Sequence, residues 1–141
     1  MLSLHRLFIK TAVVYLMLGS GLGGFLLLNK GWFQIGVPHE LITIHNHIIS
    51  VGFILMMIMG VAYWMFPRPA GVPLQKTARE PLAWANYFLL NVGLILRIVS
   101  EPFPQRPGTG KLLGLSALLQ MLGLAAFVLG IWKRVRFPLS K

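Results

Sequence analysis

The sequence predicts an all-α fold: an integral membrane four-helix bundle with both termini cytoplasmic. Of the 141 residues, 56% are hydrophobic and 11% are charged, and the mean hydropathy is +0.73, whereas ordinary soluble domains carry about 25% charged residues. The charged residues also gather at the ends of long apolar runs. The net charge of +10 therefore indicates membrane topology, and we expect no nucleic-acid partner.

Four apolar segments are long enough to cross a bilayer, and we expect them to form a single domain over residues 1–141. The expected helices lie at about 7–29, 40–66, 82–100 and 111–133. A spanning helix needs about 20 predominantly apolar residues. The third segment is the weakest because Arg97 interrupts it, although Pro81 suits a first helical turn. The first segment exceeds the apolar core of a signal peptide, so we expect a retained membrane anchor.

The distribution of Lys and Arg predicts how the chain is oriented. With a cytoplasmic N-terminus, nine basic residues lie inside: Arg6, Lys10, Arg68, Lys76, Arg79, Lys133, Arg134, Arg136 and Lys141. Three lie outside: Lys30, Arg106 and Lys111. We therefore expect a multi-pass protein of a bacterial or archaeal cytoplasmic (inner) membrane, in contact with the lipid bilayer. His45 and His47 then fall near the outer end of the second helix.

These two histidines open an apolar run that extends to Phe66. Titratable side chains inside a membrane are costly and are functional by default. Residues two apart on a helix point about 200° apart, so His45 and His47 cannot bind one metal ion together. Each ring can donate one N–H to the carbonyl four residues back and keep its other nitrogen for a metal. That carbonyl belongs to Leu41 for the first ring and to Thr43 for the second. Hydrogen-bonding histidines at the membrane interface are the alternative.

Other positions on and before this helix have structural explanations. On a straight α-helix, the stripe below His45 contains Gly52, Met56 and Tyr63. Gly52 leaves backbone bare, where either a flat macrocycle or a neighbouring helix can lie close. Met56 is expected to fill the core, as methionine commonly does. The small residues of GSGLGG, residues 19–24, predict close helix packing.

The run HNHIISVGFILMMIMGVAYWMFPR, from His45 to Arg68, resembles the tenth transmembrane helix of subunit I of the haem-copper oxidases, most closely the cbb-type and nitric-oxide-reductase branches. The shared positions are His45, His47, Gly52, Gly60, Tyr63 and Pro67. Residues 90–99, LNVGLILRIV, are also similar to part of the NnrS family of membrane haem proteins linked to nitric oxide stress. The resemblance implies that the two histidines ligate the iron of two different haems. Since the chain has no cysteine, such a haem b is held non-covalently.

The resemblance does not extend to a copper site. The oxidases use three further histidines for copper and another for the low-spin haem, but this chain adds only His5 and His39, neither in a spanning segment. Copper is therefore not expected, and whether the protein is an enzyme stays open. Subunit I consists of three arcs of four helices, so we expect this chain to be one arc that forms a homo-oligomer, a trimer or alternatively a dimer. His47 of one protomer and His45 of the next would then ligate one haem.

Arg97 is the only cation inside an apolar segment. Its partner is either Glu101, four residues on, or a haem propionate, which the oxidases also bind with arginines after this helix. The expected function is that of a membrane b-type haem protein serving electron transfer, with a redox partner, or binding NO or O2. The alternative is a non-catalytic assembly or haem-handling partner of a respiratory complex. A divalent-metal site and hydrolytic chemistry lack the side chains that they need.

Overall fold

The computed structural model describes residues 3–66, 80–132 and 134–135, and the described residues contain helices and no β-strand. α1 (Leu4–Leu28) continues into a π-helical turn, η1 (Asn29–Phe33). The second long helix consists of α2 (Glu40–His47), the π-helix η2 (Ile48–Leu55) and α3 (Met56–Met65). α5 (Pro81–Ser100) and α6 (Thr109–Trp132) follow. The all-α prediction is confirmed, and four helices are long and apolar enough to cross a membrane.

The helix bounds differ little from those expected from the apolar runs. The largest difference is at the end of the first helix, which continues to Phe33 because η1 adds a π-helical turn after α1. α5 begins with Pro81 in its first turn, where the missing N–H of proline costs no hydrogen bond. Lys10 lies within α1, as the expected helix at about 7–29 implies.

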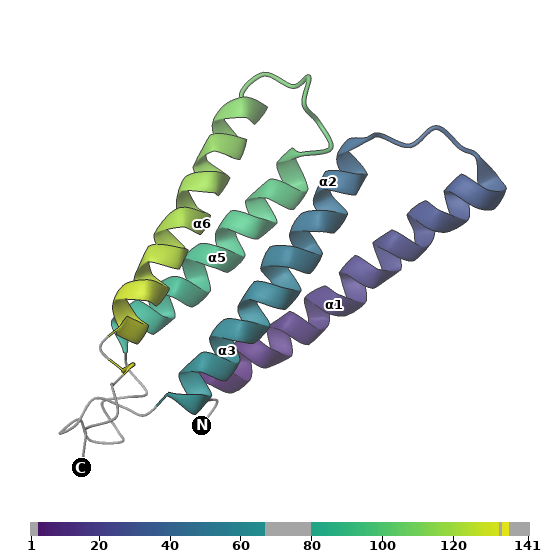
Figure 1. The fold of residues 1–141 in the computed structure, drawn as a ribbon. Coiled ribbons are helices and arrows are strands. Elements are labelled where there is room, and N and C mark those ends of the chain that lie inside the picture. Colours follow the sequence, from purple (N-terminus) through teal and green to yellow (C-terminus); the bar gives the residue numbers. More distant parts are fainter. Residues whose placement is uncertain (1–2, 67–79, 133, 136–141) are drawn as a thin grey trace, which may run out of the picture.

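The four helices form two antiparallel hairpins, α1 with α2–α3 and α5 with α6 (Figure 1). The loops after α1 and after α5 lie at one end of the molecule, which we call the loop end. α1 begins and α6 ends at the opposite end. α5 and α6 pack along their length, whereas α1 diverges from α2 towards the loop end (Figure 1).

The core lies where the two hairpins meet, and an aromatic cluster forms the part of it near the end at which α1 begins. Phe8 is fully buried, with its ring centroid 5.5 Å from that of Tyr63 and 5.1 Å from that of Tyr87. These three residues belong to α1, α3 and α5, so the cluster joins both hairpins. Met56 is 1% exposed, which confirms the prediction that it fills the core.

Polar side chains inside the bundle pair with one another across helices. Three such pairs are Tyr15 with Asn91 at 3.1 Å, Thr11 with Tyr87 at 2.9 Å, and Asn86 with Tyr63 at 3.1 Å. Hydrocarbon offers no hydrogen bonds, so polar groups in spanning helices need partners within the protein. The outer surface is apolar, with Met17 71% and Met121 67% exposed, which suits contact with lipid.

The packing prediction for residues 19–24 holds for Gly19 and Gly23 but not for Ser20 and Gly24. Gly19 and Gly23 face the second helix, and a Cβ atom on Gly19 would lie 2.6 Å from Cδ1 of Ile49. A Cβ atom on Gly24 would meet nothing within 4 Å. Ser20 and Gly24 instead line a cavity, because α1 has already begun to diverge from α2 at this point.

Candidate functional site

The histidine pair lies at the end of α2, directly before the π-helix η2. A π-helix places more residues in each turn than an α-helix, so residues after it are rotated from α-helical register, and such segments are frequent at functional sites. The sequence prediction assumed a straight α-helix. Even so, Gly52 faces α1, as His45 does, because a Cβ atom at Gly52 would lie 2.7 Å from Cγ of Tyr15.

The ring of His45 contacts the backbone of α1. Its Nδ1 lies 2.9 Å from the carbonyl oxygen of Gly19. The carbonyl of Leu41, the acceptor expected from the sequence, is therefore not the one used. The reason is the lack of side chains on α1 at this point: Gly19 and Gly23 let the imidazole approach the helix backbone. A helical carbonyl has a second lone pair available for such a bond.

The ring of His47 is held by its own helix. Its Nδ1 lies 3.0 Å from the carbonyl oxygen of Thr43, as the sequence predicted. The two histidines thus use different elements for the same hydrogen bond, α1 for His45 and α2 for His47. Both side chains are partly buried.

These hydrogen bonds assign the proton of each neutral ring. A carbonyl oxygen can only accept, so Nδ1 carries a hydrogen in both rings, and in the neutral form, which metal ligation requires, Nε2 has the lone pair. Among the described residues no cluster of three or more His, Cys, Asp or Glu side chains is present. Each histidine therefore offers one nitrogen ligand on its own. Neither is part of a complete metal-ion site formed by the described residues.

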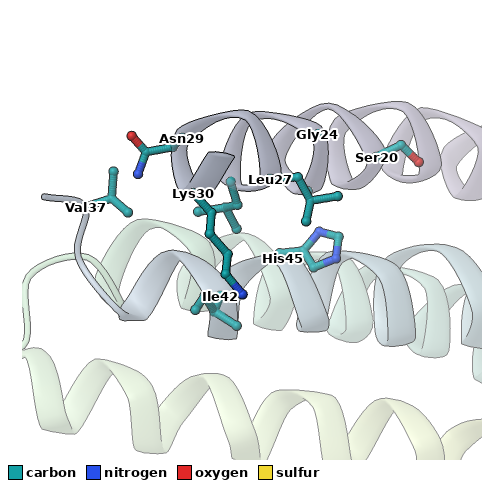
Figure 2. Close-up of a pocket in the computed structure, with 10 residues that line it drawn as sticks. Ser20, Gly24, Leu27, Asn29, Lys30, Val37, Ile42 and His45 are labelled. Carbon is teal, nitrogen blue, oxygen red and sulfur yellow. The ribbon is translucent and has the colours of Figure 1, made fainter. Parts of the chain in front are cut away.

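A cavity of about 720 Å³ adjoins His45 at the loop end. It lies between the last turns of α1 and the first turns of α2, and its walls include Gly23, Gly24, Leu27, Lys30, Ile42 and His45. Figure 2 shows the His45 ring directed from α2 towards α1, with Lys30 extending from η1 towards Ile42. The walls are mostly apolar, with a few polar groups, as is usual for small-molecule and cofactor sites.

Gly52 has a packing role in this structure. A Cβ atom there would lie 2.7 Å from Cγ of Tyr15 and 2.9 Å from Cδ2 of Leu94. Of the two alternatives open at this position, the contacts describe helix packing, with side chains from α1 and α5 covering the bare backbone. Gly52 does not line the cavity beside His45.

Arg97 pairs with its local partner. Its Nε lies 3.2 Å from Oε2 of Glu101, one turn further along α5, and both side chains are mostly buried. The two atoms are within ion-pair distance but not aligned as a hydrogen bond. Arg97 does not line the cavity beside His45. Within the chain, its charge is therefore compensated by Glu101.

Sequence reasoning missed Lys30, which it used only to assign topology. A signal was present, because few residues separate the ends of the first two apolar segments. A short connection keeps the end of one helix near the start of the next. The polar side chains of α5 that bond Tyr15 and Tyr63, Asn91 and Asn86, were also missed, although they stand out in an apolar segment.

Comparison of the chain with protein-family models, with curated proteins and with solved structures gave no match. The features of the chain that bear on its function are therefore the geometry of His45 and His47, the cavity and the sequence pattern around the two histidines.

Proposed function

We propose that this chain is a membrane protein that binds haem b non-covalently through His45 and His47, and that it serves electron transfer or the binding of NO or O2. The observation that carries the proposal is the hydrogen bonding of the two rings. Each Nδ1 is bound to a backbone carbonyl, so each Nε2 is available as a ligand. Metal-ligating histidines are commonly held in this way. The resemblance of residues 45–68 to oxidase subunit I supports the same two residues.

The cavity beside His45 is open-sided, mostly apolar and large enough for a macrocycle. Its volume of about 720 Å³ falls within the range of about 300–1,000 Å³ for ligand sites. His45 would supply a nitrogen ligand, while Gly24, where a Cβ atom would meet nothing within 4 Å, leaves open backbone surface against which a flat ring can lie. Haem, when bound, supplies an iron that changes between ferric and ferrous states and, where one axial position is open, binds diatomic gases.

The second axial ligand decides which of the two functions follows. His47 does not line the cavity, so one chain offers a single ligand to a haem bound there. We propose that His47 of an adjacent protomer supplies the other ligand in a homo-oligomer, a trimer or alternatively a dimer. An iron with two histidine ligands favours electron transfer. With His45 alone, one position stays open for NO or O2.

The proposal also includes an orientation and a location. With both termini cytoplasmic, the loop end and the cavity face the outside of a bacterial or archaeal cytoplasmic membrane. The support is the excess of Lys and Arg on the side of the termini.

A haem-handling or assembly role is the second candidate. One observation favours it: a cavity that offers one histidine from its own chain would hold haem less firmly than a site with two. Such a protein would pass haem to a respiratory complex. It would show weaker, exchangeable binding, whereas an electron carrier would retain its haem through purification.

An absorption experiment tests the proposal. The purified protein would be measured oxidised, reduced with dithionite, and reduced under CO, for the wild type and for the His45→Ala, His47→Ala and His39→Ala variants. His39 is an exposed residue at the start of the same helix and is the matched control. We expect a Soret band that His45→Ala abolishes and His39→Ala leaves unchanged. If the wild type shows no Soret band after haem is supplied, the proposed function is wrong.

A further inference from the structure

Among the described residues, Lys30 is the only Lys, Arg, Asp or Glu that lines the cavity beside His45. The other walls are apolar or neutral, and Figure 2 shows the Lys30 side chain extending from η1 towards Ile42 on α2. A lysine carries an ammonium group on an apolar stem, so it can contribute apolar surface along its length and a charge at its tip. The cavity therefore combines an apolar interior with one cation.

The backbone around Lys30 is held in place by its neighbour Asn29. The Asn29 side chain is buried and forms two hydrogen bonds with the backbone of Ile35, to the carbonyl oxygen at 2.8 Å and from the amide nitrogen at 3.0 Å. The amide of Gln34, which has a φ of 50°, also donates to the carbonyl of Asn29 at 2.7 Å. These bonds close the π turn in which Lys30 lies. The backbone position of Lys30 beside the cavity is thus defined by the fold, and its side chain is exposed.

The charge of Lys30 is not compensated by any described residue. The ion pairs among the described residues are Arg97 with Glu101 and Arg134 with Glu80. Glu40, which begins α2, is not paired with Lys30. A cation at the edge of an apolar cavity favours an anionic group on the occupant.

We propose that Lys30 binds a carboxylate of the cavity's occupant and thereby sets which way the ligand enters. The inference rests on the proposed function: for haem b, the carboxylate is a propionate, and the porphyrin lies with its propionate edge at the loop end. Lys30 thus takes the role that the sequence gave Arg97 as one alternative, since Arg97 is paired with Glu101 and lies outside the cavity.

Haem and haem dimethyl ester are the probes that test this proposal, because esterification removes the carboxylate charges and keeps the iron and the ring. Both would be titrated into detergent-solubilised apoprotein and their Kd values measured from the Soret band. For the wild type we expect the ester to bind about tenfold more weakly than haem, the loss of a charge-assisted hydrogen bond. The Lys30→Gln variant should bind haem more weakly than the wild type by a similar factor, and its Kd values for haem and for the ester should be equal.

Two further variants separate charge from folding. Lys30→Arg keeps the charge and should retain most of the discrimination between haem and ester. Lys111→Gln is the matched control, since Lys111 is an exposed lysine near the start of α6 that does not line the cavity, and it should behave as the wild type.

The outcomes distinguish this inference from the proposed function. If haem binding depends on His45 but the wild type and Lys30→Gln bind haem and ester with the same Kd, the role of Lys30 is overturned and the haem proposal stands. If the wild type binds neither probe, both proposals fail together.

Discussion

The imidazole of His45 lies so close to Gly23 that a Cβ atom on that glycine would be 2.6 Å from Cε1 of the ring. The same ring bonds the carbonyl of Gly19, one turn earlier on α1. The orientation of a candidate ligand on the second helix is therefore determined by two glycines of the first.

Gly23→Ala should displace the His45 ring and break its bond to Gly19. We expect a loss of about 1–3 kcal/mol in stability, the usual effect of overpacking a close contact. Thermal unfolding in detergent measures it. Gly21→Ala is the matched control, because a Cβ atom at Gly21 meets nothing within 4 Å. Under the haem proposal, Gly23→Ala should also weaken the Soret band while Gly21→Ala does not. Equal behaviour of the two variants would contradict the assigned packing.

The hydrogen bond between Asn86 and Tyr63 should make a small contribution to the free energy of unfolding. Asn86 is fully buried and donates to the Tyr63 hydroxyl at 3.1 Å, but its Oδ1 has no hydrogen-bond partner among the described residues. A double-mutant cycle with Asn86→Ala and Tyr63→Phe should give a coupling of about 0.6 kcal/mol, the average for such bonds in membrane helices. Strictly additive losses of unfolding free energy would show that the pair is not coupled.

The ion pair between Glu80 and Arg134 should contribute more to the free energy of unfolding than the pair between Arg97 and Glu101. Arg134 is 4% exposed, pairs with Glu80, and lies 5.5 Å from the centre of the Tyr63 ring. It joins the start of α5 to the chain just after α6. Removing the carboxylate from a buried cation is strongly destabilising, so Glu80→Gln should cost about 2 kcal/mol or more.

Glu101→Gln is the comparison for that change. Its carboxylate pairs with Arg97 within one helix turn, a contact that holds no two helices together. We expect a smaller loss than from Glu80→Gln, because the Arg97 side chain is 23% exposed whereas that of Arg134 is 5% exposed. Measured by the same unfolding assay, a larger loss from Glu101→Gln than from Glu80→Gln would reverse this order and contradict the argument.

If adjacent protomers share a haem, its binding should depend on assembly. Native mass measurement in mild detergent should then find haem on species of three protomers, or of two, and little on the monomer. His47→Ala should remove haem from the oligomer as His45→Ala does, because each iron would lose one of its two ligands. A monomer that carries haem with two histidine ligands would exclude the shared site.

The helices were predictable from the sequence because a long apolar run between charged residues has few possible structures in a membrane other than a spanning helix. The hydrogen bond from His47 to Thr43 was also predictable, since both residues belong to one helix. The acceptor of His45 was not, because it lies on a neighbouring helix whose position no local pattern specifies. The π-helical turns after Leu28 and His47 were missed for another reason. Hydrophobic periodicity follows side chains, whereas a π turn is a change in backbone hydrogen bonding.

The unequal anchoring of the two rings has a mechanical consequence. Because the acceptor of His45 belongs to α1, a small slide of α1 along the second helix would tilt that ring, whereas His47, tethered to its own helix, would move as one body with it. A displacement between the first two helices would therefore reorient the imidazole of His45 and leave that of His47 unchanged. Motion of α1 can therefore change the orientation of the His45 ring, whereas the orientation of the His47 ring relative to its own helix stays the same.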